Sequence, residues 1–422
     1  MGFFVFLYSI TGIGMIVSNY KLNRRILSSI NIYLIIWVLM VLLFGARWIN
    51  YYYISEKTML FIYISTVLVF LGYRLGSKIK LSNKPKPPKT KKSFFKNKRK
   101  LKNEILIISF ISMLAIIPNT IFLMQRYGFN LLSKTTQIYY DNVAGTAPFS
   151  IPYIGALAQV ACILAGIYFA LYGFKKFLLL PLVLAMVGIL PSGSRGWLIL
   201  TILFVLFPTF ITKRFGIKTK LSKGKIVFII GILLTFVLFL ILTINRSKYL
   251  DPNIYKYMSP GMIKVANSAP WLFKLYQYFA SPIGVYNAYL AEPNYYFGKN
   301  TFAVLYNFLN KMGVDVVYDR YQKFYSIPIE TNVGTWLLEL TQDFTYIGLM
   351  YVVFLFSIFV GYFERKAVIY KKAEDLMISS LLNTVLVMSF FVWYFREGTM
   401  IVVLLVCLLI KVFSKIRIPI RI

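Results

Sequence analysis

Two carboxylates, Glu339 and Asp343, lie four residues apart within an apolar segment of the chain. In a helix this spacing places both side chains on one face, one turn apart. A carboxylate inside or at the mouth of a membrane helix must be solvated, paired or protonated, and paired acids are a usual source of general acid/base chemistry. Two interpretations stay open: catalysis by one of the acids, or an ion pair with Arg195 or Arg396.

A second candidate site is the segment Pro-Ser-Gly-Ser-Arg-Gly at positions 191–196, between two short apolar segments. At about 1.5 Å per residue, a helix over 177–190 reaches only about 21 Å of an approximately 30 Å hydrocarbon core, so the turn is expected below the outer surface. Arg195 at this depth costs roughly 2.5 to 3.5 kcal/mol unless it meets water, a partner or an anion. The glycines let backbone N–H groups approach a phosphate closely. The alternative is a simple hairpin turn whose arginine reaches the headgroups.

Three further arginines, Arg246, Arg320 and Arg396, are expected on the same side of the membrane as Arg195. A guanidinium group binds two phosphate oxygens at once, which suits a diphosphate better than the point charge of lysine does. The four arginines are therefore candidate phosphate-binding residues, and the sequence alone does not show that they converge. The resemblance described below assigns Arg195 to a diphosphate, with Arg246, Arg320 or Arg396 assisting.

One outward loop, 246–332, is long and rich in tyrosine. Its apolar part, 271–290, is interpreted as helices that lie at the outer interface or dip back into it, interrupted by Pro282. Tyrosine rings stack on the apolar faces of sugars, whereas an aromatic belt at the membrane interface is the alternative interpretation. The tyrosines in question are Tyr276, Tyr278, Tyr286, Tyr289, Tyr295 and Tyr296.

The elements that must position these residues are eleven apolar segments. With 59% hydrophobic residues and a mean hydropathy of +0.69, a soluble protein of 422 residues is excluded. The composition predicts an all-α, polytopic membrane protein with about eleven transmembrane helices and one long extracytoplasmic loop containing interfacial helices. The predicted spans are 3–17, 26–44, 58–73, 105–124, 151–171, 177–190, 197–211, 226–244, 335–362, 376–395 and 400–410.

Charge fixes the expected orientation, because basic residues concentrate at the cytoplasmic ends of membrane helices. Loops on one side carry 32 Lys and Arg against 4 acids, and loops on the other carry 15 against 10. We therefore place the amino terminus outside and the carboxyl terminus in the cytoplasm. The segment 78–103 is interpreted as a basic cytoplasmic linker weakly attracted to anionic lipid, rather than as a nucleic-acid site.

The chain has no histidine, so the commonest acid/base group at neutral pH and the commonest metal ligand are missing. Cys162 and Cys407 both fall inside predicted spans, where a thiol behaves as a small apolar group. We expect neither a disulfide framework nor a cysteine metal site. The first apolar segment lacks a basic start and a small-residue cleavage pattern, and is expected to be retained rather than removed as a signal peptide.

Three motifs together resemble one family. They are Ser-Gly-Ser-Arg-Gly at 192–196, Thr-Asn-Val-Gly-Thr at 331–335 and Asp-Phe-Thr-Tyr-Ile-Gly at 343–348. With the long outer loop between them, they resemble the Wzy-type oligosaccharide repeat-unit polymerases of bacterial O-antigen, capsule and exopolysaccharide pathways. The likeness extends from about residue 151 to about 395. Thr345 departs from the pattern, because the family often has glycine there.

The resemblance implies a glycosyltransferase at the outer face of the cytoplasmic membrane that uses no metal or other cofactor. Such enzymes move a growing glycan from undecaprenyl diphosphate onto the non-reducing end of a new lipid-linked repeat unit. Carried onto this chain, the resemblance assigns Arg195 to the diphosphate and to catalysis. Asp343 or Glu339 would orient or deprotonate the acceptor hydroxyl. Tyr278, Tyr286 and Asn332 would hold the glycan. A flippase and a chain-length regulator are the implied partners, with membrane lipids.

Three other functions are open, among them a membrane scaffold or sensor whose basic linker recruits a partner. O-antigen ligases share the donor lipid, but that family is expected to use a histidine in its outer loop, which this chain lacks. A lipid-linked oligosaccharide flippase or other transporter predicts inverted repeats and cationic residues through both leaflets. The sequence has no internal repeat, and its polar motifs gather on one side.

Overall fold

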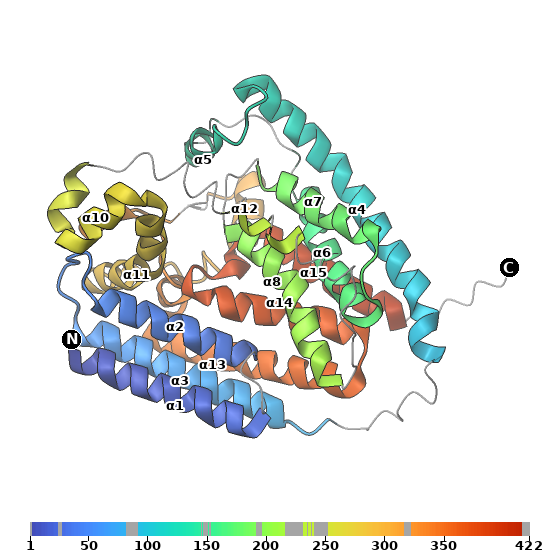
Figure 1. The fold of residues 1–422 in the computed structure, drawn as a ribbon, viewed down its shortest axis with the longest axis horizontal. Coiled ribbons are helices and arrows are strands. Elements are labelled where there is room, and N and C mark those ends of the chain that lie inside the picture. The colour runs from blue at the N-terminus through green and yellow to red at the C-terminus, as the bar shows by residue number, and fades with distance from the viewer. Residues whose placement is uncertain are drawn as a thin grey trace. The chain divides into compact units, whose positions relative to one another are not determined.

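Helices dominate the computed structural model, which describes residues 2–23, 28–81, 92–144, 146, 151, 153–190, 196–215, 231–233, 235–237, 239, 252–315 and 322–415 (Figure 1). Within these ranges, six helices are long and apolar enough to cross a membrane: Gly2–Lys21, Glu56–Lys78, Lys98–Tyr127, Ile154–Tyr172, Trp336–Tyr370 and Ala373–Phe390. Shorter apolar helices are Ser29–Gly45, Lys176–Gly188, Gly196–Thr212 and Gly398–Phe413. The apolar helices indicate a membrane-embedded protein, as predicted, but eleven spans are not confirmed.

Ten of the eleven predicted spans overlap helices whose bounds are described. The eleventh, 226–244, lies for most of its length outside the described residues, and its described residues, 231–233, 235–237 and 239, are helical. Helices suit these apolar segments because a helix satisfies its own backbone polar groups where water is absent. By contact the chain divides into two compact units, and each is described by itself.

The first unit contains the described parts of Met1–Gly76, Arg246–Gly361 and Val385–Glu397. Its elements are α1 (Gly2–Asn23), α2 (Ser29–Gly45), most of α3 (Glu56–Lys78), η5 (Pro252–Tyr257), α10 (Pro260–Ser268), α11 (Pro270–Ala291), α12 (Ala303–Lys311), β1 (Tyr325–Ser326), β2 (Glu330–Thr331), the first part of α13 (Trp336–Tyr370), the end of α14 (Ala373–Val387), η6 (Met388–Phe390) and η7 (Tyr394–Arg396). Helices α1 and α2 pack together, and α3 approaches α13 closely. At Gly72 in α3, a Cβ atom would lie 2.6 Å from the Phe354 carbonyl oxygen, so only glycine fits there.

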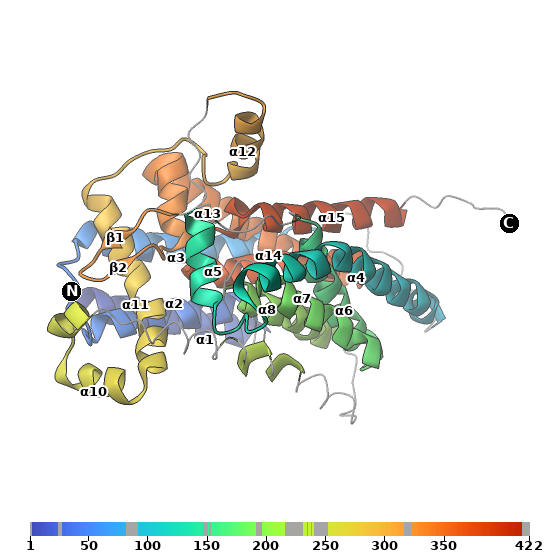
Figure 2. The ribbon, with the colours of Figure 1, turned by 90° about the horizontal axis from the view of Figure 1, so that it is seen from above.

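The described part of the long loop 246–332 contains η5, α10, α11 and α12 and the antiparallel pair of β1 and β2, joined by irregular chain. The Ser259 hydroxyl begins α10 by accepting a hydrogen bond from the Met262 N–H at 3.3 Å, with Pro260 at the first helical position. Helix α11 packs on α10, α2 and β1, and Figure 2 shows it running across α2 rather than alongside it. The predicted interruption at Pro282 is wrong, because α11 continues through this residue to Ala291.

Helix α13 bends at Thr345, whose backbone angles are φ 61° and ψ −174°. This conformation is essentially restricted to glycine, because a Cβ atom crowds the neighbouring carbonyl groups. The position is the one at which the sequence departs from the Wzy-type pattern. The bend separates a short first segment, which carries Glu339 and Asp343, from the longer remainder of the helix.

The second unit contains the described parts of Ser77–Asn245, Tyr362–Thr384 and Gly398–Ile422. Its elements are α4 (Lys92–Tyr127), α5 (Thr135–Val143), η1 (Ile154–Ala156), α6 (Leu157–Tyr172), η2 (Lys176–Leu178), α7 (Leu179–Gly188), α8 (Gly196–Thr212), η4 (Lys213–Phe215), the end of α13, most of α14 and α15 (Gly398–Lys415). Helix α6 packs against α4, α7 and α8. Gly166 permits the contact with α8, since its Cβ would lie 2.7 Å from the Val205 carbonyl oxygen. Cys162 and Cys407 are buried in α6 and α15.

Candidate active site

The first segment of α13 presents two buried carboxylates one helical turn apart. Glu339 and Asp343 are 1% and 2% exposed. They lie on one helix, as their spacing predicted. A buried carboxylate needs donors for its oxygens, because burial removes the water that would otherwise solvate it. The structure meets this need in a different way for each acid.

Glu339 is bound by an arginine and two N–H donors. Arg396 donates from Nη1 to Glu339 Oε1 at 2.9 Å, and Gln322 donates from Nε2 to the same oxygen at 3.1 Å. The backbone N–H of Trp393 donates to Oε2. The ion pair with Arg396, one of the pairings that the sequence left open, is therefore present, and catalysis by either acid stays a prediction. Arg396 itself is buried in η7.

Asp343 is bound by two consecutive residues of the long loop. The backbone N–H and the side-chain amide of Asn300 donate to Oδ1, at 2.9 and 3.1 Å. The backbone N–H and the hydroxyl of Thr301 donate to Oδ2, at 2.6 and 2.7 Å. We call Asp343, Asn300 and Thr301 the Asp343 cluster. Hydrogen bonds to a charged acceptor are shorter and stronger than neutral ones, so this cluster holds the start of α12 against α13.

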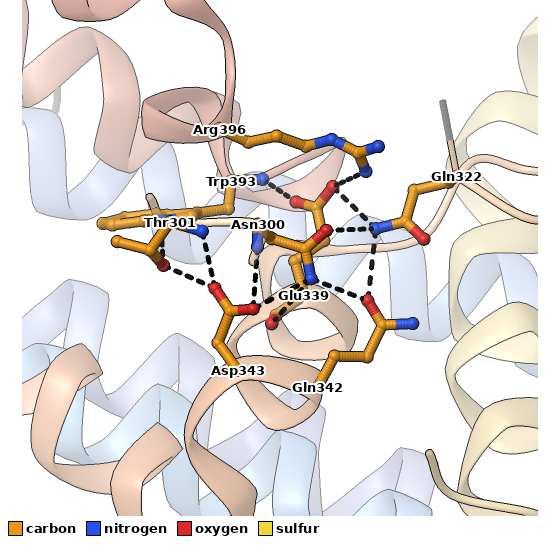
Figure 3. Close-up of polar contacts among 8 residues, drawn as sticks. All are labelled: Asn300, Thr301, Gln322, Glu339, Gln342, Asp343, Trp393 and Arg396. Atoms are coloured by element: carbon orange, nitrogen blue, oxygen red, sulfur yellow. Dashed lines mark hydrogen bonds and ion pairs between the residues drawn. The ribbon is translucent and has the colours of Figure 1, made fainter. Parts of the chain in front are cut away.

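The two carboxylates are joined by amide side chains, as Figure 3 shows. Gln322 Nε2 donates to Asn300 Oδ1 and to Gln342 Oε1, both at 3.3 Å. The Asn300 side-chain amide in turn donates to Gln342 Oε1 at 3.0 Å. One network therefore includes the ion pair and the Asp343 cluster. Low local polarity strengthens such a network and makes the loss of any one partner costly.

Aromatic rings cover the Trp393 side of this network. Trp393 lies 5.1 Å from Phe395, 5.4 Å from Phe356 and 6.0 Å from Trp336, between ring centroids. Its indole Nε1 donates to Thr301 Oγ1 at 3.1 Å. Because the Thr301 hydroxyl also donates to Asp343, a continuous path of hydrogen bonds runs from Trp393 through Thr301 to Asp343.

Close to the network, burial changes the pKa of Tyr325 in β1. Burial, assisted by the neighbouring Tyr296 and opposed by a hydrogen bond with Gln342, raises the pKa of Tyr325 to about 12. Burial likewise raises the pKa of Tyr276 in α11 to about 12. Both phenols are therefore neutral at physiological pH and act as hydrogen-bonding groups rather than as bases.

The predicted sugar-binding residues are placed differently from one another. Tyr286 is 0% exposed and its hydroxyl contacts that of Thr341 at 3.2 Å. A role for its ring in glycan stacking does not fit this burial, because a sugar cannot reach either face. Tyr278 is half-buried and stacks on Phe391 with ring centroids 5.8 Å apart. Asn332 is also half-buried and follows β2 directly.

Of the predicted diphosphate-binding residues, Arg396 is the one that the structure places in the network. Arg195, Arg246 and Arg320 lie outside the described residues. Their convergence with Arg396 stays a prediction. The Ser-Gly-Ser-Arg segment at 192–195 likewise lies outside the described part of the chain, directly before α8.

Five residues of the network were not predicted from the sequence: Asn300, Thr301, Gln322, Gln342 and Trp393. Gln342 carried a usable signal, since it is a polar residue in an apolar helix three positions after Glu339. Asn300 and Thr301 follow a turn in which Phe297 and Gly298 both have positive φ. The glycine was a sequence signal for this turn, because glycine adopts positive φ readily. No local pattern indicated that this turn meets Asp343.

Compared with known protein families, with curated proteins and with solved structures, the chain has no match.

Proposed function

We propose that this membrane protein is a repeat-unit polymerase that elongates a polysaccharide at the outer face of the cytoplasmic membrane. The growing glycan moves from undecaprenyl diphosphate to a hydroxyl at the non-reducing end of a new lipid-linked oligosaccharide. One observation carries the proposal: the hydrogen-bonded path Trp393–Thr301–Asp343, which brings a hydroxyl of the long loop onto a buried carboxylate of α13. The substrate class rests on the resemblance of 192–196, 331–335 and 343–348 to the Wzy-type polymerases.

In the proposed reaction, Asp343 receives the proton of the acceptor hydroxyl through Thr301. The acceptor oxygen bonds to the anomeric carbon of the donor glycan, and the bond from that carbon to the diphosphate oxygen breaks. The diphosphate leaves with the bonding electron pair. The acceptor proton passes to Thr301 Oγ as the Thr301 proton passes to Asp343 Oδ2, across the existing 2.7 Å contact. A base positioned at such a distance contributes about 10² to 10⁴ in rate.

The leaving diphosphate needs fixed positive charge, since negative charge grows on it as the bond breaks. Arg396 is the described guanidinium of the network, and Glu339 orients it through the 2.9 Å contact. In this role Glu339 is a positioning residue. Arg195, Arg246 and Arg320 complete the proposed anion site on the strength of the sequence alone.

The proposed orientation places the amino terminus outside and the carboxyl terminus in the cytoplasm, with about eleven spans. It rests on the charge difference between the two sets of loops. The same proposal places the loop 246–332 outside and the linker 78–103 inside. A flippase that delivers repeat units and a regulator of chain length are the proposed partners.

The test compares Thr301→Val with Thr301→Ser in cells whose own copy of the gene is deleted. Valine keeps the shape of threonine but removes the hydroxyl, so proton transfer to Asp343 is lost, and single lipid-linked repeat units should accumulate. Serine keeps the hydroxyl and should support near-normal polymer length. Thr301→Val also removes one hydrogen bond from Asp343 and one from Trp393 Nε1, so its unfolding temperature should fall. Membrane insertion and a cooperative unfolding transition well above the assay temperature, checked for both purified variants, separate chemistry from folding. A Thr301→Val protein that makes polymer of ordinary length contradicts the proposed path.

A further inference from the structure

Helix α12 exposes its apolar side. Its polar side carries Ala303, which is buried, then Asn307, which is half-buried, and Asn310, which is exposed, at helical spacing. The opposite side carries a continuous set of exposed apolar side chains: Phe302, Leu305, Phe308 and Met312. A helix on the surface of a soluble domain shows the reverse arrangement. An apolar side directed outward requires an apolar environment or a partner.

A lipid-facing surface begins close to the attachment point of α12. Asn300 and Thr301, which immediately precede this helix, are bound to Asp343 in α13. Beyond the bend at Thr345, α13 exposes an apolar side chain at every fourth position: Ile347, Tyr351, Leu355 and Phe359. In a helix long and apolar enough to span a membrane, such a stripe faces lipid. Figure 2 shows α12 standing out from the other helices of the first unit.

The charges around α12 suit the boundary between hydrocarbon and headgroups. Lys299 precedes the helix and Lys311 is its last residue, so the apolar side has a lysine near each end. Lysine side chains lay their apolar stems along hydrocarbon while the ammonium group reaches the phosphates of the headgroups. A short amphipathic helix with this pattern lies in the plane of the membrane interface.

We infer that α12 lies in the membrane interface, with Phe302, Leu305, Phe308 and Met312 in contact with the hydrocarbon of bilayer lipids. The helix is thereby a lipid-contacting element attached directly to the Asp343 cluster. One consequence rests on the proposed function: a lipid-linked substrate would contact α12 before it contacts Asp343. The lipid contact itself does not depend on any enzymatic activity.

The experiment places one environment-sensitive fluorophore at a time on the full-length protein in nanodiscs of defined phospholipids. Cys162 and Cys407 are replaced by alanine, and a single cysteine is introduced by Leu305→Cys, Met312→Cys or, as the matched control on the polar side, Asn310→Cys. We expect the labels at 305 and 312 to be quenched strongly by a lipid that carries a nitroxide on its acyl chain, and weakly by iodide in water. The label at 310 should show the opposite preference.

Two outcomes overturn the inference. Equal quenching by iodide at 305 and 310 places both sides of α12 in water. Protection of 305 from both quenchers means that another protein or a second copy of this chain covers the helix. Because no substrate is present, these outcomes are independent of whether the protein polymerises glycan. Should Leu305→Cys fail to fold, the label at 312 gives the same comparison.

Discussion

Arg396 and Glu339 form an ion pair in which both side chains are almost fully buried, with Nη1 and Oε1 2.9 Å apart. The pair connects the turn before α15 to the first segment of α13. Removing two charges from water is costly, and their attraction offsets that cost only while both partners are present. The ion pair therefore makes the placement of each residue depend on the other.

Breaking this pair from one side should destabilise the protein strongly. Arg396→Met leaves the Glu339 charge buried without its guanidinium, and we expect the free energy of unfolding to fall by about 3 to 5 kcal/mol. The double variant Arg396→Met with Glu339→Leu should recover most of that loss, although it should not polymerise glycan. Denaturant unfolding in detergent micelles measures both values.

A control for this experiment is the pair Lys100 and Glu104 on α4, whose lysine side chain is 58% exposed. Lys100→Met should change stability by less than about 1 kcal/mol, since water screens an exposed pair. Equal losses for Arg396→Met and Lys100→Met would contradict the importance of the buried pair.

The Asp343 cluster predicts slow amide exchange at Asn300 and Thr301. In Asp343→Asn a neutral amide replaces the carboxylate. Its NH₂ group faces the N–H donors of Asn300 or Thr301 and cannot accept their hydrogen bonds, so at least one of these bonds is lost. Each lost bond to a charged group is worth about 1.5 to 3 kcal/mol, so exchange at these two amides should accelerate roughly 10- to 100-fold. Hydrogen–deuterium exchange with mass spectrometry measures it. The amides of α10, a helix that packs on α11, should keep their rates. Acceleration across the whole first unit would mean general unfolding instead.

Thr345→Gly should stabilise the protein. Threonine at φ 61° and ψ −174° costs about 1 to 3 kcal/mol, whereas glycine adopts these angles freely and loses about 0.5 to 1 kcal/mol through its greater freedom when unfolded. The net expected gain is about 1 kcal/mol, measured as a higher midpoint of thermal unfolding. Thr345→Ala keeps the Cβ atom and should give little gain. If alanine stabilises as much as glycine, strain at this residue is not the cause.

Arg195→Ala should insert into the membrane normally and leave single lipid-linked repeat units unpolymerised. The reason is electrostatic, because the diphosphate would lose a guanidinium where negative charge develops. Gel analysis of surface glycan measures chain length, and Arg195→Lys separates simple charge from the two-point geometry of arginine. An ordinary chain-length distribution in Arg195→Ala would show that this residue does not bind the leaving group.

Orientation can be tested with a reagent that does not cross membranes. Asn310→Cys in α12 should react with an impermeant maleimide on intact cells, whereas Lys371→Cys, just after α13, should react only after the cells are opened. Cys162 and Cys407 are buried and give little background. The reverse pattern would place the site on the cytoplasmic side and refute both the orientation and the proposed function.

The sequence predicted the apolar helical segments and the polar residues that interrupt them. This was possible because a helix in lipid needs a long run of apolar residues regardless of which other segments it packs against. The same local rule placed Glu339 and Asp343 on one side of one helix, since helical spacing depends only on residues a turn apart. Both the helices and this pair of acids therefore followed from the chain alone. The continuation of α11 through Pro282 did not follow, because its packing on α2 and α10 outweighs the local penalty of proline.

Tertiary structure alone decided which groups bind the two acids. Arg396 lies 57 residues from Glu339 along the chain, and Asn300 lies 43 residues from Asp343. No periodicity links residues so far apart, and the sequence offered both Arg195 and Arg396 as partners of one of the two acids. The choice depends on how the loop folds back against α13, where distance and the exclusion of water, rather than residue type, determine which donor meets which carboxylate.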